Sequence, residues 1–160
     1  MTLLGDILTF GSNVKSAELP IALLPINNAS TSMVPIRIAL VGLSASAKTS
    51  WAGDAHLPYL LSDAGRSHFE IIALLNSSVA AAEASKKHFR LPGRVKAYGD
   101  PSVLAQDLDV DLVVCCTRVD VQLPTIAPSL RYGNIVIVEW PLAEVLEKAQ
   151  DLLSAIAAVG

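Results

Sequence analysis

The chain has 160 residues, of which 52% are hydrophobic and 17% are charged, and its formal net charge is −3. This length suits one domain with a buried core, and the charge balance gives no electrostatic basis for binding nucleic acid or an anionic membrane. No apolar run approaches the roughly 20 residues that a membrane-spanning helix requires. We therefore expect a globular protein without a direct nucleic-acid or membrane partner.

The first 34 residues differ from the rest of the chain. They contain one basic residue, Lys15, and an apolar run from Leu19 to Pro25 that prolines interrupt. A secretory signal has a basic start and an unbroken apolar stretch, and a mitochondrial leader is rich in arginine. We expect residues 1–34 to be a poorly ordered leader and linker that precedes a domain spanning residues 35–160.

From Pro35 onward, apolar runs typical of strands alternate with helical patterns. The predicted strands are residues 36–41, 69–75, 96–98, 112–116 and 134–138. The predicted helices run from a cap at Thr49 or Ser50 to about residue 62, and over residues 79–89, 101–106, 122–132 and 142–159. Continuous apolar strands joined by helices indicate a parallel sheet covered on both faces. We predict an α/β, doubly wound, Rossmann-like fold with strand order 3-2-1-4-5.

Two cysteines and three histidines are the residues that a disulfide or a soft-metal site could use. Cys115 and Cys116 are adjacent in a predicted strand and face opposite ways, which favours two buried thiols over a disulfide or a shared metal site. This pattern fits a reducing compartment, so we expect a cytoplasmic protein, or a nuclear one if it is a regulator. His56, His68 and His88 lie on separate elements without paired ligand spacing, and the sequence predicts no metal site.

A loop of small residues follows the first predicted strand. Gly42, Ser44 and Ala47 occupy the three positions of a G-x-G-x-x-G motif, with serine in place of the second glycine. The backbone N–H groups of this loop can hold a pyrophosphate at the start of a helix. A plain turn glycine followed by a helix-capping cluster is the alternative, and Lys48 either adds a charge for phosphate or is simply solvated. The predicted phosphate-binding residues are Gly42, Ser44, Ala45, Ser46 and Ala47.

The second predicted strand ends at Asn76, Ser77 and Ser78. An acidic residue at this place contacts the ribose 2′-hydroxyl in many NAD-binding proteins. Since an amide and hydroxyls replace it here, a 2′-phosphate meets no repulsion, and Arg118 after the fourth strand is a candidate counter-charge. We therefore favour NADP over NAD, with Asn76 and Ser77 near the ribose, while simple helix capping by these residues remains the alternative.

Four segments together resemble the nucleotide-binding half of the Gfo/Idh/MocA oxidoreductases. They are residues 36–51, 76–78, 111–119 and 138–142. Lys48, Trp51 and the run Val-Glu-Trp-Pro-Leu-Ala make the chain most similar to the fungal branch of the family, which includes the galactose-pathway co-repressor of yeasts. The resemblance extends over residues 35–159 and implies a second, sheet-rich domain. The sequence ends before that domain, so we expect a fragment, a truncated product or a lone nucleotide-binding domain.

The resemblance also implies roles for residues outside the loop at Gly42. It places Trp51 at the cofactor, and Thr117, Arg118 and Val119 along the adenosine and pyrophosphate, where an ordinary structural loop is the alternative. Glu139 and Trp140 stand where family enzymes have Glu-Lys-Pro near the nicotinamide. Indole donates a hydrogen bond but cannot shuttle a proton near neutral pH, so Trp140 can stack on nicotinamide, wall a pocket or pack, and Pro141 admits a cis bond.

Two hypotheses about function follow. The first is an NAD(P)-dependent oxidoreductase that transfers a hydride to or from a sugar, polyol or related small molecule, with its proton-transfer group missing or outside this chain. The second is a regulator that binds the dinucleotide without turnover and contacts a protein partner. A homo-oligomer is compatible with both, and a nonfunctional truncation with exposed apolar surface is the third reading.

Overall fold

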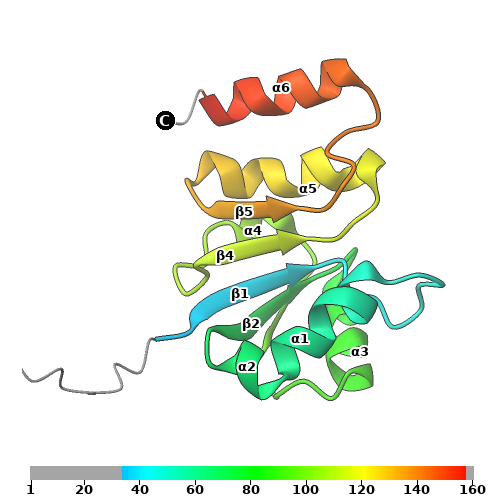
Figure 1. The fold of residues 1–160 in the computed structure, drawn as a ribbon, viewed down its shortest axis with the longest axis vertical. Coiled ribbons are helices and arrows are strands. Elements are labelled where there is room, and N and C mark those ends of the chain that lie inside the picture. Colours follow the sequence, from blue (N-terminus) through cyan, green and yellow to red (C-terminus); the bar gives the residue numbers. More distant parts are fainter. Residues whose placement is uncertain (1–33, 158–160) are drawn as a thin grey trace, which may run out of the picture. The chain divides into compact units, whose positions relative to one another are not determined.

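The computed structural model describes residues 34–157, so the leader predicted for residues 1–34 lies outside the described residues except for Val34. The described part is built around one sheet of five parallel strands (Figure 1). The strands are β1 (Ile36–Val41), β2 (Phe69–Leu75), β3 (Lys96–Tyr98), β4 (Leu112–Cys115) and β5 (Ile135–Val138). Their order, β3-β2-β1-β4-β5, confirms the predicted topology.

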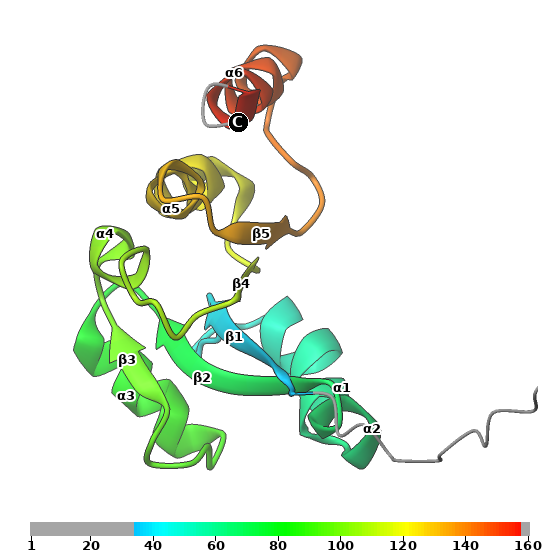
Figure 2. The same cartoon turned by 90° about the vertical axis from the view of Figure 1, so that its left-hand side faces the viewer.

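Helices cover the sheet from both sides (Figure 2). The helical elements are η1 (Ala52–His56), α1 (Leu57–Leu61), α2 (Asp63–Arg66), α3 (Val79–His88), α4 (Pro101–Leu104), α5 (Val119–Arg131) and α6 (Leu146–Ala157). Buried side chains of η1, α1 and α3 belong to one apolar cluster, and those of α4, α5 and α6 belong to another. Among residues 34–157, no helix is long and apolar enough to cross a bilayer.

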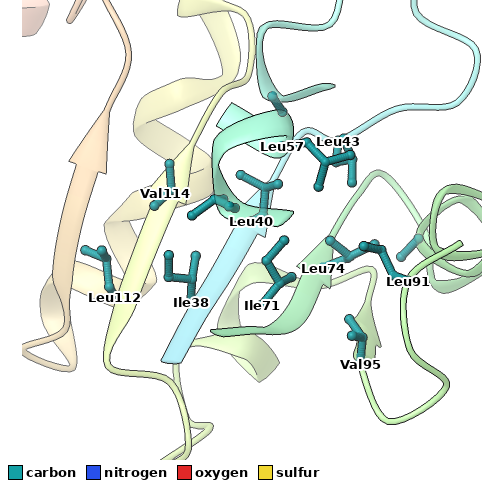
Figure 3. Close-up of a cluster of buried hydrophobic side chains, with 13 residues drawn as sticks. Ile38, Leu40, Leu43, Leu57, Ile71, Leu74, Leu91, Val95, Leu112 and Val114 are labelled. Carbon is teal, nitrogen blue, oxygen red and sulfur yellow. The ribbon is translucent and has the colours of Figure 1, made fainter. Parts of the chain in front are cut away.

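The two apolar clusters explain why the strands are apolar throughout. Ile38 and Leu40 of β1 point to the cluster that α1 covers (Figure 3), whereas Ala39 and Val41 point to the cluster that α5 covers. Alternate residues of a strand face opposite sides of the sheet, so a strand covered on both sides needs apolar residues at every position. Leu40 is completely buried, and its neighbour Leu74 of β2 is as well.

Three predicted helices differ in extent from the observed ones. The first begins at Ala52 as η1 and continues as α1 to Leu61, close to the predicted end, and the extended Ser62 then starts the unpredicted α2 by accepting a hydrogen bond from the Gly65 N–H. The helix expected from residue 122 begins at Val119, directly after the extended residue Arg118. The helix expected from residue 142 begins at Leu146, and the apolar residues Leu142 and Val145 lie exposed in the preceding loop.

A network of charges joins the loops at the amino-terminal ends of the strands. The Asp107 carboxylate, only 8% exposed, accepts hydrogen bonds from Lys96 Nζ at 2.9 Å and from the Tyr98 hydroxyl at 2.8 Å. Burial opposes the charge of Asp107, but these bonds outweigh burial and lower the pKa of its carboxyl. Burial and the bond to Asp107 raise the pKa of Tyr98 to about 12. Hydrogen bonds from Arg37 likewise lower the pKa of Asp111.

These lowered pKa values predict how stability depends on pH. A carboxyl whose pKa is lower in the folded state stabilises the fold above its ordinary value of 3.8, and this contribution disappears as the pH falls through the folded-state value. We expect Asp107→Asn to lower the free energy of unfolding at neutral pH by about 1–3 kcal/mol. Urea unfolding should show this difference shrinking below about pH 4, where the wild type protonates as well. The exposed Asp63→Asn serves as the control, and an equal loss there would contradict the prediction.

Candidate functional site

A cavity of about 420 Å³ opens at the carboxyl ends of the central strands. In open α/β sheets, ligands bind in the crevice outside these strand ends, where the strand order reverses. Here β1 pairs with β2 on one side and β4 on the other, which makes this end of β1 the switch point. The volume falls within the ~300–1,000 Å³ typical of ligand pockets. The lining residues are Val41, Gly42, Ser44, Ser46, Leu75, Asn76, Ser77, Ala81, Gly99, Pro101, Thr117, Val121 and Thr125.

Gly42 forms the turn at the floor of this cavity. Its φ is +88°, a left-handed conformation that side chains disfavour, and its N–H donates to the Leu75 carbonyl at 3.1 Å. A Cβ at this position would lie 2.9 Å from the carbonyl oxygen of Cys116. The turn therefore requires glycine, because the backbones of two neighbouring strand ends meet there without room for a side chain.

The loop after Gly42 places only some of its predicted phosphate-binding residues at the cavity. Ser44 and Ser46 line it, whereas Ala45 and Ala47 are exposed and do not. The Ser46 N–H donates to Ser44 Oγ at 3.3 Å. Within residues 34–157, the N–H groups of Ala45 and Ala47 meet no hydrogen-bond acceptor, which leaves them free for a ligand.

The side chain of Asn76 has a structural task that the sequence did not reveal. Its Nδ2 lies within hydrogen-bond distance of the Leu43 carbonyl at 2.9 Å, the Ala81 carbonyl at 3.2 Å and Ser85 Oγ at 3.0 Å. The amide group is thus committed to the loop after β1 and to α3, which leaves no N–H for a ribose. Among the described residues, its buried Oδ1 has no hydrogen-bond partner. Ser78, not Asn76, caps α3 by accepting from the Ala81 N–H.

Ser77 is the polar residue at the tip of β2 that faces both the cavity and solvent. The lining of the cavity at Gly42 is uncharged, although Ser77 also lines a neighbouring cavity together with Asp100. A ribose hydroxyl and a 2′-phosphate would both meet hydroxyls and backbone dipoles here. The cavity lining is therefore mostly apolar, with hydroxyl groups and no charge.

The structure does not place Arg118 where the predicted counter-charge is needed. Its guanidinium pairs with the Asp120 carboxylate at 2.6 Å and 3.0 Å, and its side chain is 83% exposed. Arg118 precedes α5 at the end of β4, and β1 separates β4 from the tip of β2. The preference for NADP thus loses the support that Arg118 was expected to give.

The remaining predicted residues divide into one that lines the cavity and several that do not. Thr117 lines it, whereas Val119 forms the first turn of α5 outside the lining. Trp51 precedes η1 and is 60% exposed. Trp140 is 89% exposed and precedes a cis peptide bond to Pro141. Neither tryptophan contributes to this cavity.

Glu139 meets His56 instead of the cavity. Its Oε1 is hydrogen-bonded to His56 Nε2, and the two residues are 83 positions apart in the chain. Cys116, the residue after β4, lies beside them, and burial together with the Glu139 charge raises the pKa of its thiol to about 12. His56 thus meets potential ligand residues that lie far from it in the sequence and that ligand spacing along the chain could not indicate.

Gln122 is a further residue whose place the sequence did not indicate. Its side chain is almost fully buried, and its Nε2 donates to the Thr117 carbonyl at 3.2 Å and to the Glu139 carbonyl at 3.1 Å. One amide group of α5 thus ties together the loops that follow β4 and β5. These bonds fix the backbone at the cavity and beneath the His56–Glu139 pair.

The part of the lining contributed by β3 and α5 was also missed. Gly99 and Pro101 follow β3, and Val121 and Thr125 lie on α5. A usable signal existed for the first two, since they directly follow a predicted parallel strand whose carboxyl end must open to the same crevice. Val121 was missed because α5 begins earlier than expected, and Thr125 because the predicted helix did not show which of its faces meets the cavity.

The residues present fit a dinucleotide at this cavity. The glycine turn leaves the close approach to the backbone open, and the lining combines apolar side chains with the hydroxyls of Ser44, Ser46, Ser77, Thr117 and Thr125 and carries no charge. A doubly wound parallel sheet with such a cavity at its switch point defines a Rossmann-type nucleotide-binding protein. Residues 36–160 match the model of an oxidoreductase family with an NAD-binding Rossmann fold. The chain belongs to this family, the Gfo/Idh/MocA oxidoreductases.

Individual relatives include enzymes and a regulator. Dehydrogenase aclE of Aspergillus oryzae is 35% identical over 117 residues, which cover 73% of this chain and 31% of the relative. A super-repressor mutant of Gal80p from Saccharomyces cerevisiae is 28% identical with a TM-score of 0.68, over 79% of this chain and 33% of that one. Myo-inositol dehydrogenase from Lactobacillus casei, solved with NAD(H) and myo-inositol, is 26% identical with a TM-score of 0.63, over 78% and 34%. The chain thus spans about a third of the length of these relatives.

Proposed function

We propose that this chain binds a nicotinamide dinucleotide in the cavity at Gly42 and serves as the nucleotide-binding part of an oxidoreductase. The observation that carries the proposal is the turn at Gly42, where a Cβ would collide with the Cys116 carbonyl and the absence of a side chain keeps the cavity floor open. When bound, the nicotinamide would supply hydride transfer to or from a small molecule such as a sugar or polyol. The buried thiol of Cys115 and the half-buried thiol of Cys116, which form no disulfide with each other, support work in a reducing compartment, which we propose is the cytoplasm.

The lining residues suggest how each part of the dinucleotide is held. The pyrophosphate is assigned to the loop after Gly42, where Ser44 and Ser46 line the cavity, because phosphates bind to backbone N–H groups at a strand–helix turn. The adenosine ribose is assigned to Ser77 at the tip of β2. Thr117 lies across β1 from Ser77 and supplies a hydroxyl to the same cavity.

The uncharged lining supports acceptance of both NAD and NADP. A carboxylate at the tip of β2 would favour NAD, and a cation there would favour NADP. Since Ser77 is neither and Arg118 is paired with Asp120, we expect the two affinities to lie within about tenfold, or ~1.4 kcal/mol, of each other. Titration of the purified chain with NADH and NADPH, followed by nicotinamide fluorescence, measures this ratio. Binding of neither dinucleotide would overturn the proposed function.

Ser77→Asp should convert this tolerance into a preference for NAD. A carboxylate at position 77 would repel a 2′-phosphate and accept hydrogen bonds from a ribose diol, so NADPH affinity should fall by about tenfold or more while NADH affinity is retained. Ser67→Asp, an exposed position after α2, is the matched control and should leave both affinities unchanged. Equal effects of the two substitutions would place the ribose elsewhere.

A regulator that binds the dinucleotide without turnover is the second candidate function. Trp140 stands at the lysine position of the family enzymes, is 89% exposed and cannot transfer a proton near neutral pH. The similarity to Gal80p, described as a transcriptional regulator in Kluyveromyces lactis, supports this candidate, and the exposed indole offers a contact for a protein partner.

A turnover assay separates the two candidates. The chain is incubated with NAD or NADP and a panel of sugars and polyols, and reduction of the nicotinamide is followed by absorbance. An oxidoreductase should reduce the cofactor with at least one substrate, whereas a regulator should bind the dinucleotide with no reduction. The same assay applies to Trp140→Lys under both candidate functions. This substitution restores an ionisable group at the lysine position of the family enzymes, and it leaves the lining of the cavity unchanged.

A further inference from the structure

We propose that His56, Cys116 and Glu139 form a binding site for a divalent transition-metal ion of the zinc class. The three residues come from η1 and from the ends of β4 and β5, so the fold and not the local sequence brings them together. Each offers one ligand atom, and these atoms all lie within 4.8 Å of one another. Within residues 34–157, no other three His, Cys, Asp or Glu side chains gather in this way.

The donor set selects the metal. Imidazole nitrogen, thiolate sulfur and carboxylate oxygen together suit Zn²⁺, which binds such ligands at about 2.0–2.3 Å in tetrahedral geometry. Ca²⁺ and Mg²⁺ prefer ligand sets made of oxygen alone, so the sulfur of Cys116 disfavours them. Three protein ligands leave a fourth position for water or another small ligand. The Cys116 thiol gives up its proton to solvent when the metal binds.

The surroundings hold the three ligands in place before a metal arrives. The Glu139 N–H donates to the Cys115 carbonyl at 3.1 Å, and the Glu139 carbonyl accepts from the buried Gln122 side chain. The side chains of His56 and Glu139 are 29% and 25% exposed, which leaves a path for an ion while shielding the site from bulk water. Cys116 packs against the apolar cluster beneath α1. The fold therefore fixes the backbone at Glu139 and keeps the three ligand atoms within 4.8 Å of one another.

This site is separate from the proposed dinucleotide site. None of its three ligands lines the cavity at Gly42. Gly42, at the end of β1, nevertheless lies close to the backbone of Cys116 at the end of the neighbouring strand β4. Cys115 faces the other side of the sheet, where its side chain joins the cluster covered by α5. A metal bound here would connect η1 to the ends of β4 and β5.

The test is metal titration of the full chain after treatment with a chelator. Calorimetry with Zn²⁺ should give one ion per chain, and Co²⁺ should give a thiolate-to-metal charge-transfer absorption band. Cys116→Ser and His56→Asn should each weaken Zn²⁺ binding by more than the ~10–100-fold typical of losing an outer-sphere partner. Cys115→Ala and His68→Asn are the matched controls and should retain the wild-type affinity, since neither residue belongs to the site.

A second measurement uses only the unaltered protein. Alkylation mapped by mass spectrometry compares the rate of modification at Cys116 with and without Zn²⁺, and we expect Zn²⁺ to slow it severalfold. Absence of stoichiometric Zn²⁺ binding, unchanged binding in Cys116→Ser, or alkylation of Cys116 that Zn²⁺ leaves unaltered would each overturn the proposal. Dinucleotide titration reads a different cavity, so either proposal can fail without the other.

Discussion

Replacing Gly42 with valine should abolish measurable binding of NADH and NADPH. A left-handed conformation costs a residue with a Cβ roughly 1–2 kcal/mol, and the new Cβ would also meet the Cys116 carbonyl oxygen at 2.9 Å and Thr117 Cγ2 at 3.2 Å. The ends of β1 and β4 must then move apart, which distorts the cavity floor. Fluorescence titration with each dinucleotide, on protein shown to be folded by circular dichroism, provides the measurement.

Gly133→Val is the matched control for this substitution. Gly133 also has a left-handed backbone, with φ of +77°, but a Cβ there would meet nothing within 4 Å. It should therefore suffer the same conformational penalty and keep its affinity for the dinucleotide. Retained affinity in Gly42→Val, or an equal loss in both variants, would refute the assignment of the cavity floor as the binding surface.

Gly65→Ala should destabilise the fold by more than about 3 kcal/mol, the upper end of the usual effect of overpacking. A Cβ at Gly65 would lie 1.9 Å from the Tyr59 carbonyl oxygen and 3.0 Å from Leu60 Cα. Both contacts are with the backbone of α1, so no side-chain rotation can relieve them. Urea unfolding measures the loss as a lower midpoint at unchanged slope.

Gly93 allows the opposite result to be tested in the same assay. Alanine at this position would meet nothing within 4 Å, and its backbone is not left-handed. Gly93→Ala should therefore be neutral or stabilise the protein by roughly 0.4–1 kcal/mol, because alanine restricts the unfolded chain. A loss in Gly93→Ala as large as that in Gly65→Ala would show that close packing of α2 on α1 is not the cause.

The sheet was predictable because its signal is local and redundant. The strands at 36–41, 69–75 and 96–98 have the predicted bounds, and helices between them permit few strand orders. Helix starts were less predictable. Val119 and Val121 are β-branched residues, which favour strands. They nevertheless form the first turn of α5, which begins directly after the extended residue Arg118.

The site was only partly predictable because its key contacts are distant in sequence. The pairing of Arg118 with Asp120 joins residues two positions apart and could have been inferred from their opposite charges. The contact of His56 with Glu139 joins residues 83 positions apart, and nothing near either residue indicates the other. For Asn76, its place at a strand tip was clear, but the inward direction of its amide depends on packing against α3.

The inward amide of Asn76 gives the cavity a mechanical property. It links the loop after β1, through Leu43, to α3, through Ala81 and Ser85, and so joins two walls of the cavity by side-chain bonds formed during folding. A ligand that enters does not have to order these walls, and it avoids much of the conformational entropy that an adaptable pocket would lose on binding. The protein itself thus preorganises these two walls of the cavity.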